Sequence, residues 1–153
     1  MEMVRLGIGL YGLDMSQTIE DQLEIVHTLK ATISQIREVN KGETIGYNRK
    51  ELATSRLKIA TISIGYADGL PRLAGHRKFF VSIHNKLKPI VGSVCMDMCM
   101  VDITGDEAIK ECDEVIVFGS QPSVHQLAEV AQTIPYEIFT NISERVKRVY
   151  FQE

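Results

Sequence analysis

Short runs of β-branched and aliphatic residues dominate the 153-residue sequence from about residue 25 onward, and turn-forming pairs such as Asp68-Gly69 and His84-Asn85 separate them. Runs of this length with Gly, Asp and Asn between them are typical of short strands in an antiparallel barrel or sandwich. We therefore predict a mainly β fold, an antiparallel barrel-like domain with one or two short helices. The expected strands are Leu57–Ile64, Lys78–Ile83, Lys88–Val94, Met98–Ile103, Glu114–Phe118 and Arg145–Phe151.

The segment Ile25–Val39 fits two patterns. Apolar residues at positions 26, 29, 33 and 36 suit one stripe of a helix, whereas those at 25, 29, 31 and 33 share one face of a strand. The density of Ile, Val and Thr favours the strand. The change of phase between Ile33 and Ile36 then indicates a β-bulge.

One helix is expected near the end of the chain. Ser123 is a good N-cap for a helix over Val124–Gln132, whose apolar positions recur at helical spacing. A second short helix is expected after Pro135, because proline is well tolerated in the first turn.

Composition excludes several classes of function. The net charge of −3 leaves no basic field that would gather nucleic acid, and no apolar run approaches the roughly 20 residues that span a bilayer. The start of the chain has no charged and apolar pattern of a secretory signal. Three cysteines, an odd number, favour reduced thiols over a disulfide framework, so we expect a cytoplasmic protein.

Cys95, Asp97 and Cys99 could in principle bind a metal. Thiolate zinc sites usually have a second cysteine pair or histidines downstream, and here Cys112 stands alone. We therefore expect no metal site, and interpret the paired cysteines as buried thiols that pack as small apolar side chains.

The sequence IGYADG at residues 64–69 resembles the motif that carries the catalytic tyrosine of alanine racemases. Other segments resemble the same family in the same order, including its last barrel strand, its methionine segment and its closing signature. These segments are Val4–Ile8, Gly42–Tyr47, Pro89–Asp97, Ile134–Glu137 and Ile142–Val146. By this resemblance, residues 1–13 are the last strand and exit of a pyridoxal-phosphate-binding barrel, and residues 14–153 are the C-terminal β-domain.

The resemblance implies an isomerase that interconverts L- and D-alanine for peptidoglycan synthesis, with pyridoxal 5′-phosphate as cofactor. Tyr66 matches the base for the L-enantiomer, and Met96 matches the residue whose backbone N–H meets the substrate carboxylate. A phenol ordinarily titrates near ~10, so such a base needs a nearby cation. The sequence shows no obvious cation beside Tyr66, and the family takes that charge largely from the other subunit's barrel. Asp68 and Gly69 are interpreted as the turn that holds the tyrosine.

Four residues match the family's cofactor contacts. Arg5 matches the arginine beside the pyridine nitrogen, and Gly7 and Ile8 match the backbone amides at the phosphate. Tyr136 matches a tyrosine whose hydroxyl also reaches the phosphate. In the family these four serve their own subunit, whereas the tyrosine and methionine reach into the partner's site, so a homodimer with shared sites is implied.

The lysine that holds the cofactor in this family has no counterpart in the sequence, so the chain alone is expected to be inactive. Three alternatives stay open at this stage. The chain could be a non-catalytic β-barrel binding or regulatory domain, a pyridoxal-phosphate racemase of another amino acid such as serine or lysine, or a metal-binding domain.

Overall fold

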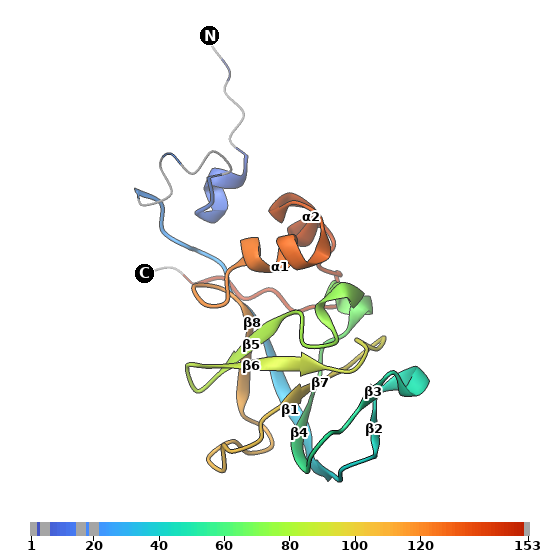
Figure 1. The fold of residues 1–153 in the computed structure, drawn as a ribbon. Helices are drawn as coiled ribbons and strands as arrows, with labels where there is room; N and C mark the ends of the chain where they lie inside the picture. Colours follow the sequence, from blue (N-terminus) through green and yellow to red (C-terminus); the bar gives the residue numbers. More distant parts are fainter. Residues whose placement is uncertain (1–2, 4–6, 15–17, 19–21, 152–153) are drawn as a thin grey trace.

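Six antiparallel strands close into a barrel in the computed structural model, which describes residues 3, 7–14, 18 and 22–151 (Figure 1). The strand order around the barrel is β1-β4-β7-β6-β5-β8, with β8 pairing back to β1. The predicted mainly β, barrel-like fold is therefore confirmed. The strands are β1 (Leu29–Val39), β4 (Leu57–Ile62), β5 (Phe80–Ile83), β6 (Lys86–Val91), β7 (Cys99–Asp102) and β8 (Glu114–Phe118).

The long strand β1 pairs with both of its neighbours and closes the barrel. Its first half pairs with β8 and its second half with β4, and the register with β4 shifts between Ile33 and Gln35. A bulge increases the local twist of a strand, which lets one strand turn from one neighbour to the other. The predicted strand and its bulge are confirmed, and the helical alternative for this segment is wrong.

Two short helices, α1 (Val124–Ala131) and α2 (Pro135–Thr140), lie together over one end of the barrel (Figure 1). Ser123 caps α1 as predicted, because its side chain accepts a hydrogen bond from the N–H of Gln126. The predicted second helix is confirmed as α2, and Pro135 lies in its first turn.

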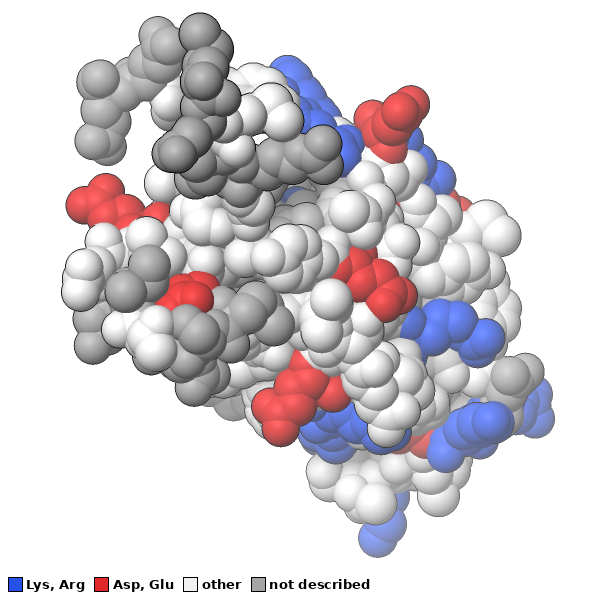
Figure 2. Space-filling view, turned by 90° about the horizontal axis from the view of Figure 1, so that it is seen from above, with Lys and Arg blue, Asp and Glu red and all other residues white. Residues whose placement is uncertain are grey.

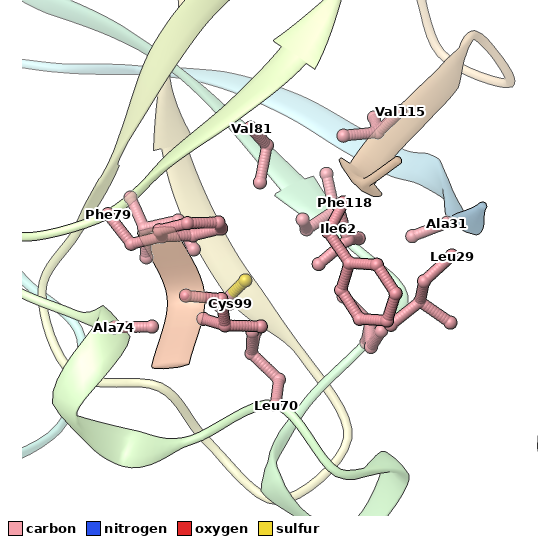
Figure 3. Close-up of a cluster of buried hydrophobic side chains, with 14 of the residues drawn as sticks. Leu29, Ala31, Ile62, Leu70, Ala74, Phe79, Val81, Cys99, Val115 and Phe118 are labelled. Carbon is pink, nitrogen blue, oxygen red and sulfur yellow. The ribbon is translucent and has the colours of Figure 1, made fainter. Parts of the chain in front are cut away.

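The hydrophobic core fills the barrel and continues beneath the helices. Ala31, Ile62, Val81 and Val115 come from four different strands and point toward a shared interior (Figure 3). Cys99 of β7 and Leu70, from the loop after β4, belong to the same core (Figure 3). Buried and exposed residues alternate in the first half of β1, whereas β4, β5 and β7 are each buried at three or more consecutive positions.

A small hairpin of β2 (Thr44–Ile45) and β3 (Glu51–Leu52) stands beside the barrel and precedes β4. It packs through a second apolar cluster that includes Ile45, Ala53 and Val91. The hairpin therefore attaches to β6 and brings the loop around Tyr47 toward the segment that follows β6.

The predicted strand Arg145–Phe151 is wrong, because those residues form turns and an irregular tail. β1 and β8 pair with each other and leave no free edge at that position. The tail instead folds on itself, and the guanidinium of Arg148 donates to the carbonyls of Ile142, Ser143 and Val146. At the other end, Ile8–Tyr11 form one 3-10 turn and not a strand, and residues 4–6 lie outside the described residues.

The face of the molecule seen from above in Figure 2 is largely uncharged where its residues are described, with acidic and basic side chains scattered over it. Several large apolar side chains of the described residues are exposed, including Leu10, Ile134 and Tyr136. Within the described residues, no helix has the length and apolar character needed to cross a bilayer.

Candidate active-site surface

Tyr66 opens a single 3-10 turn, Tyr66–Asp68, that follows the end of β4. The carboxylate of Asp68 closes this turn by accepting a 2.8 Å hydrogen bond from the N–H of Gly65. Gly69 follows with φ of +107°, a left-handed conformation that glycine adopts without strain. The Asp-Gly pair thus shapes the turn as the sequence indicated.

The tyrosine turn, residues 65–69, packs against the methionine loop, residues 93–98. The N–H of Tyr66 donates to the carbonyl of Cys95 at 2.9 Å, and the N–H of Ala67 donates to the carbonyl of Met96 at 3.0 Å. A Cβ added to Gly65 would lie 2.3 Å from the Met96 carbonyl oxygen. Glycine is therefore required here because two backbones approach each other closely.

Tyr66 and Met96 line one pocket of about 330 Å³, so the structure brings these two predicted residues together. Both residues are accessible from solvent, with Tyr66 43% and Met96 54% exposed. The other lining residues are Tyr47, Arg72, Ser93, Val94, Cys95, Asp97 and Met98.

Arg72 corrects the expectation that no cation lies beside Tyr66. Its guanidinium carbon is 6.0 Å from the centre of the Tyr66 ring, at the outer limit of a cation–π contact. Arg72 opens the next 3-10 turn, Arg72–Ala74, and the sequence reasoning missed it. Arg72 follows Tyr66 by only six residues, which was the one available signal in the sequence. That spacing alone does not show that the chain turns back and brings the guanidinium to the Tyr66 ring.

Arg145, in the closing signature, contacts both loops. Its Nε donates to Asp68 at 2.7 Å, and one of its terminal nitrogens donates to Asp97 at 2.6 Å. The backbone adds a contact, because the N–H of Ser143 donates to the carbonyl of Asp68 at 3.2 Å. These partners lie 77 and 48 positions away in the sequence, so the motifs alone did not predict the pairing.

The Asp68 carboxyl is held in its charged form. Partial burial raises its pKa, but the hydrogen bonds from Arg145 and from the Gly65 N–H outweigh burial, and the pKa lies below its ordinary value. A charged Asp68 therefore serves two groups at once, the turn that carries Tyr66 and the guanidinium.

The expected cofactor residues gather at a second place. A Cβ built on Gly7 would lie 3.6 Å from the hydroxyl oxygen of Tyr136, so this backbone and this hydroxyl are neighbours although they are far apart in the sequence. Ile8 follows in the 3-10 turn and is buried. Arg5 lies outside the described residues.

The cysteines differ in environment. Cys95 and Cys99 are buried and Cys112 is exposed. Burial raises the pKa of the Cys99 thiol far above its ordinary value, so it packs as a neutral side chain. The described residues contain no group of three or more potential ligands that could hold a metal ion.

Comparison with known proteins identifies the family. The family described as "Alanine racemase, C-terminal domain" matches residues 26–150, which is most of the chain. This chain belongs to the alanine racemase family. It has the fold of that family's C-terminal domain.

The relatives match over nearly the whole chain. Alanine racemase of Helicobacter acinonychis (strain Sheeba) is 42% identical and covers 98% of this chain, which spans 41% of that relative. Alanine racemase 1 of Caldanaerobacter subterraneus subsp. tengcongensis is 40% identical and covers 100% of this chain and 41% of its own length. The chain therefore spans about two fifths of these relatives.

Solved structures agree with the sequence comparison. Alanine racemase from Streptomyces coelicolor A3(2) superposes with a TM-score of 0.90 at 33% identity, covering 98% of this chain and 41% of its own. Alanine racemase from Bartonella henselae, solved with covalently bound pyridoxal phosphate, superposes with a TM-score of 0.89 at 35% identity. The match covers 95% of this chain and 40% of that one.

Proposed function

We propose that this chain is the C-terminal domain of a pyridoxal-phosphate-dependent alanine racemase, and that Tyr66 is its proton-transfer base for L-alanine. The observation that carries the proposal is the shared pocket of Tyr66 and Met96 on a chain of this family. When bound, the cofactor makes the α-proton of the amino acid acidic by accepting electrons into its ring.

Tyr66 is suited to exchange a proton with a substrate carbon. Its backbone is held by hydrogen bonds to the methionine loop, while its side chain reaches an open pocket. In the proposed reaction Tyr66 takes the α-proton of L-alanine as a phenolate and, in the reverse direction, returns a proton to that face as a phenol. The guanidinium carbon of Arg72 lies 6.0 Å from the centre of the Tyr66 ring, so a positive charge lines the same pocket as the proposed base.

Met96 is suited to bind the substrate carboxylate through its backbone. In the described part of the chain, the N–H of Met96 donates to no protein acceptor, whereas its carbonyl accepts from Ala67. An N–H without a partner on a pocket wall is a good donor to an anion. The carboxylate of alanine would therefore lie beside Met96, with its α-carbon toward Tyr66.

Gly7, Ile8 and Tyr136 fit the phosphate of the cofactor. Gly7 has no side chain to keep a ligand away from its backbone, and the Tyr136 hydroxyl lies beside it. In the proposed enzyme these groups would donate to the phosphate oxygens, and Arg5, which lies outside the described residues, would hold the pyridine end of the cofactor. Residues 1–13 would then be the end of the cofactor-binding barrel, and residues 14–153 the C-terminal domain.

The two sets of residues support a homodimer with shared sites. Among the described residues, the pocket of Tyr66 and Met96 is lined by neither Gly7 nor Tyr136. Each subunit would therefore use its own phosphate contacts and its partner's tyrosine and methionine. We further propose that the enzyme is cytoplasmic and bacterial and supplies D-alanine for peptidoglycan. Rescue of a D-alanine-requiring bacterial strain by the full-length gene tests this role.

The substitution Tyr66→Phe in the full-length enzyme tests the assignment of the base. It removes the hydroxyl and keeps the ring, so folding and cofactor binding should persist while racemisation falls by about 100-fold or more. Exchange of the α-proton with solvent deuterium should fall more for L-alanine than for D-alanine, which uses the opposite face. Equal wild-type exchange of both enantiomers would refute the assignment. Assays with serine and lysine test the substrate preference.

A further inference from the structure

The closing segment, residues 141–146, is the part of the sequence motif that the proposed chemistry does not use. Its backbone already packs on the tyrosine turn, because a Cβ added to Gly69 would lie 2.5 Å from the carbonyl oxygen of Asn141. Arg145 extends this contact to a second loop. Its guanidinium bridges the carboxylates of Asp68 and Asp97, one in the tyrosine turn and one in the methionine loop.

The two carboxylates belong to the same short loops as the proposed site residues, Asp68 to the turn of Tyr66 and Asp97 to the loop of Met96. One carboxylate oxygen of Asp68 accepts a hydrogen bond from the N–H of Gly65, and the other accepts one from Arg145. The guanidinium is therefore linked through Asp68 to the turn that begins at Tyr66. Asp97 follows Met96 immediately and lines the same pocket. A single side chain thus ties the base to the group that would hold the substrate carboxylate.

We propose that Arg145 is a positioning residue that fixes the tyrosine turn relative to the methionine loop. The inference rests on the proposed function for its catalytic consequence, but the coupling of the two loops is a property of the chain itself. Proton transfer depends steeply on the placement of the base, and a displacement of ~1 Å can reduce the rate by about 100-fold. A bridge between the two loops keeps their separation constant.

Arginine suits this task better than lysine. Its planar guanidinium directs separate N–H groups toward two acceptors, here Nε toward Asp68 and a terminal nitrogen toward Asp97. A lysine ammonium is a point charge on a flexible stem, so it can satisfy one carboxylate well but does not fix the angle between the two. Arg145→Lys is therefore an informative partial variant.

Loss of the bridge should affect the position of the two loops more than the overall stability of the domain. The side chains of Arg145 and Asp97 are 47% and 56% exposed, whereas that of Asp68 is 13% exposed, so solvent reaches the cation and one arm of the bridge and the bridge contributes about 1 kcal/mol or less to the overall stability of the domain. The barrel strands and the core under the helices do not depend on it. Arg145→Gln should therefore melt close to the wild-type temperature while the two loops move more freely.

Amide hydrogen exchange on this chain tests the coupling directly. In Arg145→Gln we expect the N–H groups of Tyr66 and Ala67 to exchange about tenfold faster or more, while the amides of β4 are unchanged. Arg145→Lys should recover part of the protection. Arg56→Gln is the matched control, because Arg56 also pairs with one carboxylate, that of Glu38, on an exposed part of the barrel. It should change neither amide.

The same variants in the full-length enzyme test the catalytic consequence. Arg145→Gln should lower kcat by about 10- to 100-fold and change KM for alanine less, with Arg145→Lys between it and the wild type. If Arg145→Gln unfolds, Asp97→Ala removes one arm of the bridge and should still speed exchange at Ala67. Unchanged exchange in both variants, or equal effects in Arg56→Gln, would overturn the proposal. These exchange results do not depend on whether Tyr66 is the base.

Discussion

The substitution Gly65→Ala probes the contact between the tyrosine turn and the methionine loop. Gly65 has φ of −144°, which alanine adopts easily, so the added methyl group should act only through its volume. That methyl group would lie 2.3 Å from the carbonyl oxygen of Met96 and 2.4 Å from that of Cys95. Ordinary contact begins near 3.4 Å, so one backbone must retreat by about 1 Å.

The expected cost follows from either of two responses. If the backbones stay in place, forcing a methyl group into a closed space costs about 1–3 kcal/mol. If they separate, the hydrogen bonds from Tyr66 and Ala67 are lost, and each is worth about 1 kcal/mol. Both routes give about 2 kcal/mol, which corresponds to a fall of about 4–8 °C in Tm for a domain of this size.

Thermal unfolding of this chain, followed by circular dichroism, measures the effect. Gly9→Ala is the control, because no described atom lies within 4 Å of the Cβ it would add. That variant should melt within about 2 °C of the wild type. In the full-length enzyme, Gly65→Ala should also lower kcat, because it displaces the turn that carries Tyr66. A Tm for Gly65→Ala equal to that of Gly9→Ala would refute the close-approach argument.

Two further predictions concern stability. Ser123→Ala removes the acceptor for the Gln126 N–H and should lower the free energy of unfolding, measured by chemical denaturation, by about 1 kcal/mol. A change of roughly 0.2 kcal/mol or less would show that the cap is unimportant. Burial and the neighbouring His125 lower the pKa of His27, although the Tyr11 carbonyl raises it, so the folded state prefers the neutral ring. Stability should therefore be complete above the ordinary histidine pKa near ~6.5 and fall as the pH drops below it. His27→Phe should flatten the profile between about pH 7 and 5, and an unchanged slope would contradict this cause.

Local sequence was sufficient for most of the fold. Three features depend only on residues a few positions apart: the alternation of apolar residues in β1, the turn pairs between strands and the capping serine of α1. A single sequence is therefore enough to predict them. The prediction of strand with a bulge near Ile33 succeeded for this reason. The ordered motifs also indicated the family and brought Tyr66 and Met96 forward as candidates.

Tertiary structure decided which loops meet. The tail after Arg145 has a strand-like composition, but the closed pairing of β1 with β8 leaves it no partner. The bridge from Arg145 to Asp68 and Asp97, and the position of Arg72 over Tyr66, depend on segments that only the closed barrel brings together. Charge and spacing in a sequence show which residues could pair, whereas the path of the backbone determines which of them lie within hydrogen-bonding distance.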